Sequence, residues 1–324
     1  MFVSDPDIQD RKLISLVVPF YNEEANVEST LAVIAENIDT QRYSWEVIAV
    51  NDGSSDDTLK KLLTVRSFEF KLVVVDLSRN FGKEAALSAG LEQAMGDAVI
   101  PLDADLQDPP QLISMLIEKW EEGYDVVLAR RVDRSSDSFL KRATAGAFYS
   151  VINRLSDVEI PHHVGDFRLM DRRVIDVLKT LPEARRFMKG LFAWAGFRTT
   201  IVDYIRPERN LGDSKFSGWK LWNLALEGIT SFSIVPLKIW TYIGFIVAAC
   251  SFIYGSFIVG RTILFGVDVP GYASLTSILL FMSGLQMIGL GVLGEYVGRI
   301  YLESKRRPAF VVRSVHKKAI NRDS

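Results

Sequence analysis

The sequence predicts a mostly parallel, doubly wound α/β sheet followed by two membrane-spanning helices. Two observations support this fold class. Short β-branched runs alternate with longer amphipathic runs from residue 13 to about residue 130, and two long uncharged apolar segments follow residue 238. Strands joined by helical crossovers form parallel sheets, and an uncharged helix of about 20 residues can cross about 30 Å of hydrocarbon. In such sheets ligands bind beyond the carboxyl ends of the strands.

Five buried strands and four helices are expected in the first part of the chain. The strands are LISLVV (13–18), WEVIAV (45–50), KLVVVD (71–76), DAVIPL (97–102) and DVVLA (125–129). The helices are expected near 24–38, 55–66, 83–95 and 109–122. Polar motifs follow three of these strands, namely PFYNEE, NDGSSDDT and DADLQDPP. Because parallel strands end at one edge of a sheet, these motifs should converge on one crevice.

The middle of the chain is expected to connect this sheet to a membrane. Residues 138–156 form an amphipathic helix, which either packs on the sheet or lies at a membrane surface. A loop containing VGDFRLMDRR follows, and the segment GWKLWNLALEGITSF has the apolar spacing and tryptophans of a juxtamembrane helix. We therefore place the α/β domain at 1–213 and a juxtamembrane region at 214–236.

The two apolar segments, Ile239–Gly260 and Val269–Gly294, are interpreted as a transmembrane hairpin within residues 237–302, followed by a basic tail at 303–324. Basic residues flank the pair on its outer sides: Lys215, Lys220 and Lys238 before it, and Arg299, Lys305, Arg306 and Arg307 after it. By the positive-inside rule, we expect the α/β domain and both termini to be cytoplasmic, in a multi-pass protein of the inner (cytoplasmic) membrane. The glycines at 284, 291, 294 and 298 suit a close helix contact, either within the hairpin or in a homo-oligomer.

Composition excludes several classes of protein. A formal net charge of −2 disfavours a general nucleic-acid binder. The single cysteine, Cys250, excludes an intrachain disulfide framework and a cysteine metal site. The amino-terminal MFVSDPDIQDRK has no apolar run behind a basic start, so no cleavable signal peptide is expected.

The segment PLDADLQDPP carries the strongest chemical signal. In an extended chain Asp103, Asp105 and Gln107 share one face, and two close carboxylates favour a bound cation, because they repel one another. Oxygen ligands of this kind suit Mg²⁺ or Mn²⁺. Asp108, which precedes two prolines, is expected to cap the next helix. Asp52 could accept a hydrogen bond from a base or ribose, although on its own a turn residue before Gly53 is the simpler interpretation.

The ordered set VVPFYNEE, NDGSSDDT, NFGKEAALSAGL, DADLQDPP, GDFRLM and GDSKFS resembles the inverting family 2 glycosyltransferases with a GT-A fold. Within that family it is most similar to enzymes that transfer a sugar to a polyprenyl phosphate, above all the bactoprenol glucosyltransferases, and it is related to the dolichyl-phosphate mannose synthases. The resemblance covers nearly the whole chain. It implies transfer of glucose from UDP-glucose to undecaprenyl phosphate at a membrane, for modification of a cell-surface glycan.

The resemblance also implies roles for individual residues. Pro19, Tyr21, Glu23 and Asp52 match positions for the donor base and ribose, while Asp103, Asp105 and Gln107 match the metal and diphosphate positions. Lys83 lies near the donor, unless it is structural, and Asp166 matches an acidic position near sugar and acceptor, as a base or as an orienting group. Positions for the acceptor phosphate are matched by Arg131, Arg209, Ser214 and Lys215. Asn51 departs from the pattern, since many members have a second aspartate there.

Other functions remain open at this point. The same chemistry could use GDP-mannose or a modified UDP-pentose, and a non-catalytic lipid-binding scaffold could retain the fold. A processive polysaccharide synthase is disfavoured, because the chain has no QxxRW-like motif. Relatives suggest a tetramer.

Overall fold

The computed structural model describes residues 11–66, 68–131, 164–181, 194–204, 235–266 and 271–318. The helix predicted at 138–156 and the juxtamembrane helix predicted within 214–236 lie outside these residues. The chain divides into two compact units. One comprises residues 1–153, 158–217 and 308–324, and the other comprises residues 154–157 and 218–307. The second unit thus interrupts the first in sequence.

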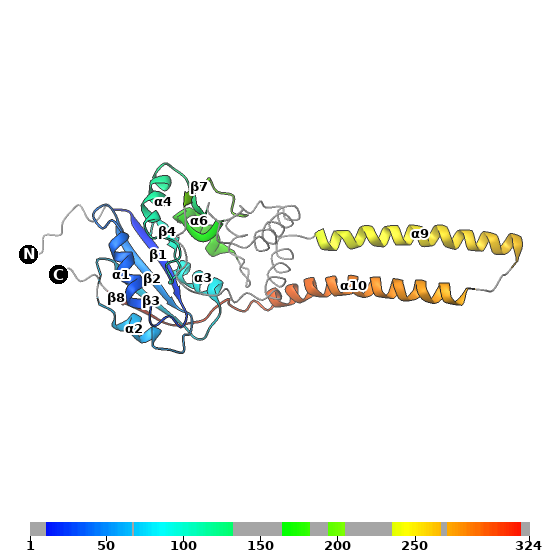
Figure 1. Ribbon diagram of the computed structural model, residues 1–324, viewed down its shortest axis with the longest axis horizontal. Helices are drawn as coiled ribbons and strands as arrows, with labels where there is room; N and C mark the ends of the chain where they lie inside the picture. Colours follow the sequence, from blue (N-terminus) through cyan, green and yellow to red (C-terminus); the bar gives the residue numbers. More distant parts are fainter. Residues whose placement is uncertain are drawn as a thin grey trace, which may run out of the picture. The chain divides into compact units, whose positions relative to one another are not determined.

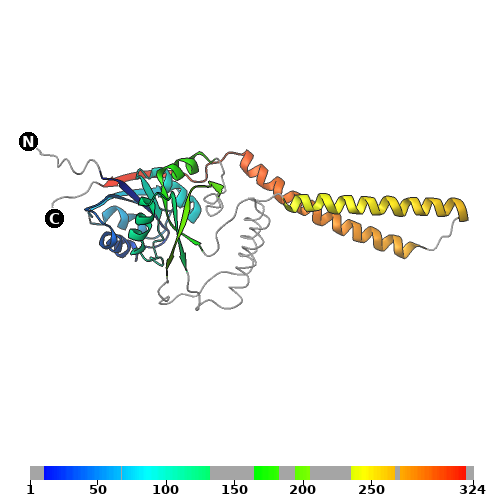
Figure 2. The same ribbon diagram turned by 90° about the horizontal axis from the view of Figure 1, so that it is seen from above.

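The first unit is built on one eight-stranded sheet (Figures 1 and 2). Its strands are β1 (Leu13–Phe20), β2 (Ser44–Asn51), β3 (Lys71–Leu77), β4 (Ala98–Pro101), β5 (Val126–Arg131), β6 (Val164–Asp171), β7 (Thr199–Tyr204) and β8 (Val312–Lys318). They lie in the order β7-β5-β6-β4-β1-β2-β3-β8. The β1, β2, β3 and β4 strands pair in parallel, as do β5 and β7, whereas β6 and β8 run antiparallel to their neighbours. The predicted mostly parallel α/β sheet is confirmed.

Helices cover both faces of this sheet (Figure 1). They are α1 (Val27–Asn37), α2 (Thr58–Thr64), α3 (Lys83–Gln93), α4 (Leu112–Glu121) and α6 (Arg172–Thr180). Residues of α1, α2 and α4 pack with Ile14, Leu16 and Val18 in one apolar cluster, while α3 packs on the other face of β1 and β2. Burial on both faces explains why these strands are almost continuously apolar, because both orientations of the side chain meet a helix.

The segment GDFRLM differs from its expected structure. We predicted a loop containing it, but residues Val164–Asp171 form β6, which lies in the sheet between β4 and β5. Phe167, Leu169 and Met170 are buried there, and Arg168 is buried as well because its guanidinium donates to the backbone carbonyls of Gly165 and Asp166. A charged residue in the middle of the segment breaks the hydrophobic pattern by which a buried strand is recognised, so the pattern does not predict this strand.

The C-terminal segment also differs from its expected structure. Residues 303–324 were predicted to be a basic tail, but Val312–Lys318 form β8 and pair antiparallel with β3. The β3 edge would otherwise present unpaired backbone groups, and β8 satisfies them. The sequence RSVHKK is charged because most of its side chains are exposed at the new edge of the sheet.

The second unit contains two long helices, α9 (Val235–Phe265) and α10 (Tyr272–Ser304). Both contain a stretch apolar enough to cross a membrane, with mean hydropathies of 2.0 and 1.6 over their best windows, and no residue of these windows is buried. Large apolar side chains without a protein core fit a lipid environment. The α9 helix extends past Lys238 and Arg261, which flank the predicted first span. Long basic side chains near a helix end can reach the membrane interface.

The glycines of α10 separate the two alternatives given for them. A Cβ added at Gly284, Gly291, Gly294 or Gly298 would meet no described atom within 4 Å, so these glycines make no close contact within the described hairpin. Gly289 does so instead, because its Cβ position lies 3.1 Å from the ring of Trp240 on α9.

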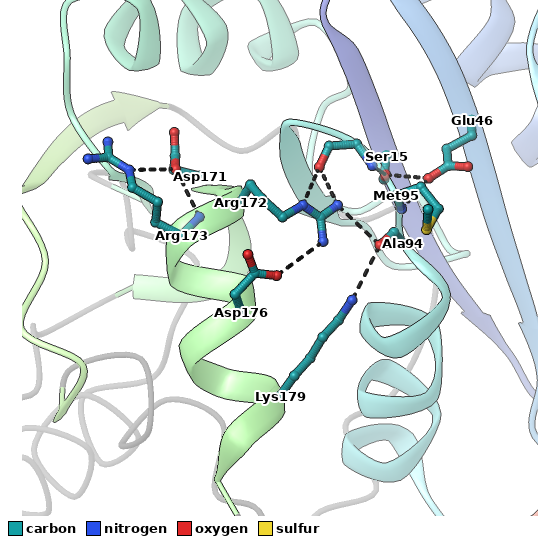
Figure 3. A network of polar contacts seen from close by, with 10 residues as sticks. Ser15, Glu46, Ala94, Met95, Asp171, Arg172, Arg173, Asp176 and Lys179 are labelled. Carbon is teal, nitrogen blue, oxygen red and sulfur yellow. Dashed lines mark hydrogen bonds and ion pairs between the residues drawn. The ribbon is translucent and has the colours of Figure 1, made fainter.

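A polar network ties α6 to the turn after α3, at the amino end of the β4 strand (Figure 3). Arg172 donates from Nε to the carbonyl of Gly96 over 2.8 Å and from Nη2 to that of Ala94 over 3.1 Å, and Lys179 also reaches Ala94. On the other side of the turn, the fully buried Glu46 accepts from Ser15 Oγ and from the N–H of Met95. This network holds the start of β4 in register. It lies at the opposite end of the strands from the polar motifs that follow their carboxyl ends.

We expect Arg172→Ala to lower the stability of the sheet unit by about 2 kcal/mol, because it removes charge-assisted hydrogen bonds to two carbonyls. That loss corresponds to a fall in Tm of about 4–8 °C. Thermal unfolding of the full chain in detergent measures it. The neighbouring Arg173→Ala is the matched control, since the side chain of Arg173 is 69% exposed and pairs with Asp171 and Asp125 instead of with the turn after α3. Equal shifts in the two variants would show that the Arg172 network has no special weight.

Candidate functional site

A cavity of about 270 Å³ opens at the carboxyl ends of β1 to β4. The predicted convergence of polar motifs is therefore present in the structure. Twelve residues line it: Pro19, Phe20, Tyr21, Glu23, Asp52, Asn80, Gly82, Lys83, Ala86, Asp103, Ala104 and Asp105. Seven of the residues named from the sequence are among them, whereas Gln107 and Asp166 lie beside the cavity rather than in its lining.

The β1 end gives the cavity an aromatic edge. Tyr21 is 47% exposed, so its ring is available to a flat ligand. The backbone N–H of Glu23 donates to Thr58 Oγ1, and its carboxylate accepts from Asn26 over 2.5 Å. The bond to Thr58 holds the segment after β1 against the start of α2. A half-exposed aromatic ring on a fixed backbone suits stacking with a nucleotide base.

Asp52 ties the β2 end to the loop before α3. The residue is 3% exposed, and its two carboxylate oxygens accept from the backbone N–H groups of Phe81 and Gly82 over 2.8 and 2.9 Å. Burial raises the pKa of this carboxyl, and the two N–H donors partly offset the effect. Asp52 thus combines the two interpretations given for it, since it lines the cavity and also holds a turn.

Gly53 makes this junction possible. It has a φ of +62°, and a Cβ added to it would lie 2.2 Å from the carbonyl carbon of Arg79. The turn after β2 and the loop after β3 therefore touch backbone to backbone. Only glycine fits this position without displacing the loop.

The acidic segment after β4 adopts a different conformation from the extended one that we predicted. β4 ends at Pro101, the N–H of Leu106 donates to the carbonyl of Asp103, and Leu106 has a φ of +50°. Residues 103–106 thus form a turn, and the premise that Asp103, Asp105 and Gln107 share a strand face is wrong. The turn nevertheless brings Asp103 and Asp105 to the cavity, while Gln107 donates from its backbone and side chain to Asp105.

Asp108 does not cap the following helix. α4 begins at Leu112, and the N–H groups of Leu112 and Ile113 donate to the carbonyls of Pro109 and Pro110. Asp108 instead accepts from the hydroxyl of Tyr204 on β7 over 2.5 Å. The two prolines delay the helix, so the aspartate lies too far upstream to act as its cap.

Lys83 is the electrostatic centre of the site. Its Nζ lies 2.7 Å from Asp103 Oδ1 and 2.8 Å from Asp166 Oδ2, so one ammonium joins the start of α3, the end of β4 and the β6 strand. Burial lowers the pKa of Lys83, but the attraction of Asp166 and Asp103 outweighs it, and the pKa is raised overall. Lys83 is therefore a cation at neutral pH.

Asp103 responds to the same surroundings. Burial raises its pKa, Lys83 lowers it, and the nearby Asp166 and Asp105 raise it again, so that the pKa remains above its ordinary value. Arg168, which the sequence reading missed, fixes the backbone carbonyls of Gly165 and Asp166. The sequence feature that could have identified Arg168 is its position in GDFRLM, two residues after the candidate site residue Asp166.

Of the residues matched to an acceptor phosphate, Arg131 lies at the end of β5 with a partly buried side chain. Arg209, Ser214 and Lys215 lie outside the described residues.

The donor set fits a divalent cation in kind. Asp103 and Asp105 present carboxylates to one cavity, and oxygen ligands suit Mg²⁺ or Mn²⁺. Among the described residues, no group of three or more histidine, cysteine, aspartate or glutamate side chains forms a complete cage. A cation here would therefore complete its coordination with oxygens of a bound ligand, as Mg²⁺ commonly does.

Comparison with known proteins gives two family matches. Residues 15–178 match glycosyl transferase family 2, and residues 235–300 match the GtrB C-terminal hairpin. A prophage bactoprenol glucosyl transferase homolog of Escherichia coli is 52% identical over 94% of this chain and 99% of its own length. The bactoprenol glucosyl transferase of Shigella phage SfV is 52% identical over the same shares. An uncharacterized glycosyltransferase of Synechocystis is 53% identical over 92% of this chain and 94% of its own.

Among solved structures, the chain is similar to glucosyl-3-phosphoglycerate synthase from Mycobacterium tuberculosis, which was crystallised with Mn²⁺, UDP and glucosyl-3-phosphoglycerate. The TM-score is 0.47 and the sequence identity 22%, over 68% of this chain and 78% of the other.

We expect Gly53→Ala to destabilise the sheet unit by about 3 kcal/mol or more, because left-handed backbone strain is joined by a clash with the Arg79 backbone. Gly123→Ala is the control. Gly123 also has a positive φ, of +94°, but its added Cβ would meet only a side-chain nitrogen of Arg198 at 3.7 Å. Thermal unfolding of the full chain should show a clearly smaller Tm loss for the control. A Gly53→Ala protein as stable as Gly123→Ala would mean that the two loops are not in backbone contact.

Proposed function

We propose that this chain, which belongs to glycosyl transferase family 2 and carries the GtrB C-terminal hairpin, transfers glucose from UDP-glucose to a polyprenyl phosphate, undecaprenyl phosphate in bacteria. The observation that carries this proposal is the identity of 52% to bactoprenol glucosyl transferases, which extends through both the sheet unit and the hairpin. The product is glucosyl phosphoryl polyprenol, a lipid-linked glucose for modification of a cell-surface glycan.

The cavity supplies the donor site in this proposal. The exposed ring of Tyr21 stacks on the uracil, with Pro19 and Glu23 beside it, and Asp52 faces the nucleoside from the β2 end. Asp103 and Asp105 hold a divalent cation, with Gln107 orienting Asp105. When bound, that cation would neutralise negative charge on the donor diphosphate and stabilise its departure. Mg²⁺ and Mn²⁺ both suit these ligands.

The acceptor in this proposal is a phosphate on a membrane lipid. Its second pKa is about 6, so at neutral pH it is an anionic nucleophile that needs no strong general base. Arg131, with Arg209, Ser214 and Lys215, binds this phosphate. Asp166, held by Lys83, then orients the acceptor or the sugar hydroxyls. An oxygen of the acceptor phosphate attacks the anomeric carbon as the bond to UDP breaks, and this single displacement inverts the anomeric centre.

The hairpin anchors the enzyme beside its lipid substrate. In the proposed topology α9 and α10 cross the inner membrane, and the sheet unit and both termini are cytoplasmic. The glycines of α10 that make no close contact within the described hairpin support a homo-oligomer, in which these surfaces meet neighbouring protomers; a tetramer remains our prediction.

The test is a transfer assay with purified full-length protein, undecaprenyl phosphate, Mg²⁺ or Mn²⁺, and a panel of radiolabelled nucleotide sugars. We expect lipid-soluble label from UDP-glucose. If label came only from GDP-mannose or a UDP-pentose, that nucleotide sugar would be the donor in place of UDP-glucose. If no donor gave label, a lipid-binding scaffold would be the better-supported function.

Asp105→Asn should lower transfer at least about 100-fold, because it removes a cation ligand while keeping the shape of the side chain. Asp108→Asn is the matched control, since Asp108 lies three residues away and bonds Tyr204 outside the cavity lining. Its transfer rate should stay within about threefold of wild type. Normal turnover by Asp105→Asn would remove Asp105 from the cation site.

Lys83→Met should shift the pH dependence of transfer. Asp103 must be ionised to hold a cation, and Lys83 lowers its pKa against the effect of burial. Without Lys83 the pKa of Asp103 rises further, so the acid limb of kcat/KM moves to higher pH. The profile is measured from about pH 5 to 8. Lys83→Arg keeps the positive charge and should leave the acid limb close to wild type; an unmoved limb in Lys83→Met would contradict this role.

A further inference from the structure

The C-terminal strand β8 contacts the end of β3, directly before a loop that lines the cavity. Arg313, on β8, donates from Nη1 to Asp76 Oδ2 over 3.1 Å and from Nη2 to the carbonyl of Ser78 over 2.8 Å. The N–H of Ser78 in turn donates to the carbonyl of Val311 over 2.9 Å. Asp76 and Ser78 lie at the end of β3, directly before the loop that supplies Asn80, Gly82 and Lys83 to the cavity.

Asp76 carries this contact across to the β2 end. Its side chain is 2% exposed, and its second oxygen, Oδ1, accepts from Asn51 Nδ2 over 2.8 Å. Asn51 is itself buried, and its Oδ1 accepts from the N–H of Ser54 over 3.3 Å. A continuous polar path therefore runs from Arg313 through Asp76 and Asn51 to the turn that contains Asp52 and Gly53.

The two arms of this arrangement meet again at the cavity. Gly53 touches the backbone of Arg79 and Asn80, and Asp52 accepts from Phe81 and Gly82. The contacts through Asp76 and Asn51 hold the turn after β2, and the contact with Ser78 holds the loop after β3. Arg313 takes part in both.

The chemistry of Asn51 fits this arrangement. An amide can donate to a carboxylate and accept from a backbone N–H at the same time, whereas an ionised carboxylate at this position could only accept. Asp76 is a buried anion, and a buried anion needs a cation and hydrogen-bond donors. Arg313 supplies the cation and Asn51 supplies a donor.

We propose that Arg313 is a positioning residue for the donor site: through Asp76 and Ser78 it sets the two loops that bind the nucleotide. The residue touches no cavity atom itself. It comes from a strand that follows both long apolar helices in the sequence. This inference rests on the proposed UDP-glucose site and adds a residue to it.

The test compares UDP binding by full-length protein in detergent, measured by calorimetry, in wild type and Arg313→Ala. We expect the Kd for UDP to rise about tenfold, because the buried Asp76 loses its cation and both loops lose a contact. At saturating UDP-glucose, kcat and the KM for undecaprenyl phosphate should change less than about twofold, since alignment of a bound donor does not involve Arg313. Lys317→Ala on the same strand is the charge-matched control and should bind UDP as wild type does.

Two further variants separate positioning from simple stabilisation of the sheet edge. Arg313→Lys keeps the charge but loses the forked geometry that reaches Asp76 and Ser78 together, so its Kd should be intermediate. Asp76→Asn removes the buried charge, and adding Arg313→Ala to it should raise the Kd clearly less than tenfold, because only the contact with the Ser78 carbonyl remains to be lost. A further tenfold rise in that double variant would overturn the route through Asp76.

Hydrogen exchange gives a readout that needs no ligand. The amides of Ser54, Phe81 and Gly82, which donate to Asn51 and Asp52, should exchange about tenfold faster in Arg313→Ala, while amides of the α4 helix keep their rates. Wild-type UDP affinity and wild-type exchange in Arg313→Ala would overturn this inference and leave the proposed function standing. Absence of UDP binding by the wild-type protein would overturn the proposed donor site, and the inference with it.

Discussion

One ammonium group, that of Lys83, fixes the relation among the three elements on which the cavity depends. Lys83 is the first residue of α3, and its ammonium contacts one carboxylate after the end of β4 and another on β6. Two partly buried carboxylates this close together would repel each other, and the lysine makes their proximity tolerable. In the proposed function the same lysine lies between the two substrates, because Asp103 belongs to the proposed donor site and Asp166 to the proposed acceptor site. The lysine that the sequence reading left as an equal choice between a structural and a donor-site role has the position for both.

Much of the sheet was predictable because its strands are buried on both faces, which leaves short apolar runs between helices that are easy to recognise. The elements that were missed are those whose polar residues have hidden partners. Arg168 makes β6 look like a loop, although its guanidinium binds the strand's own carbonyls. The basic residues of β8 resemble a tail, although Arg313 pairs with an aspartate 237 positions earlier in the chain. Neither contact shows in hydrophobic periodicity: the first joins a charged side chain to the backbone, and the second joins residues far apart in the sequence.

The site likewise has features that the sequence predicts and features that it does not. Motifs at strand ends correctly located the crevice, because the topology of a parallel sheet determines where those ends meet. The finer geometry did not follow, since the conformation of residues 103–106 depends on a turn with Leu106 at a positive φ. A leucine gives no sign of that conformation in the sequence, whereas the glycine at 53 does. Asp108 was placed as a cap on local pattern alone, and the tyrosine that binds it lies 96 positions further along the chain.

The position of β8 has a consequence for the biogenesis of the protein. A ribosome releases β1 to β7 and then both apolar helices before it reaches the strand that closes the β3 edge. Domains begin to fold during synthesis, so the sheet forms with that edge unpaired while α9 and α10 are being synthesised. The contacts of Arg313 with Asp76 and Ser78 form only after β8 has been synthesised. With the proposed lipid acceptor, this order means that a fully formed catalyst exists only after both apolar helices have been made.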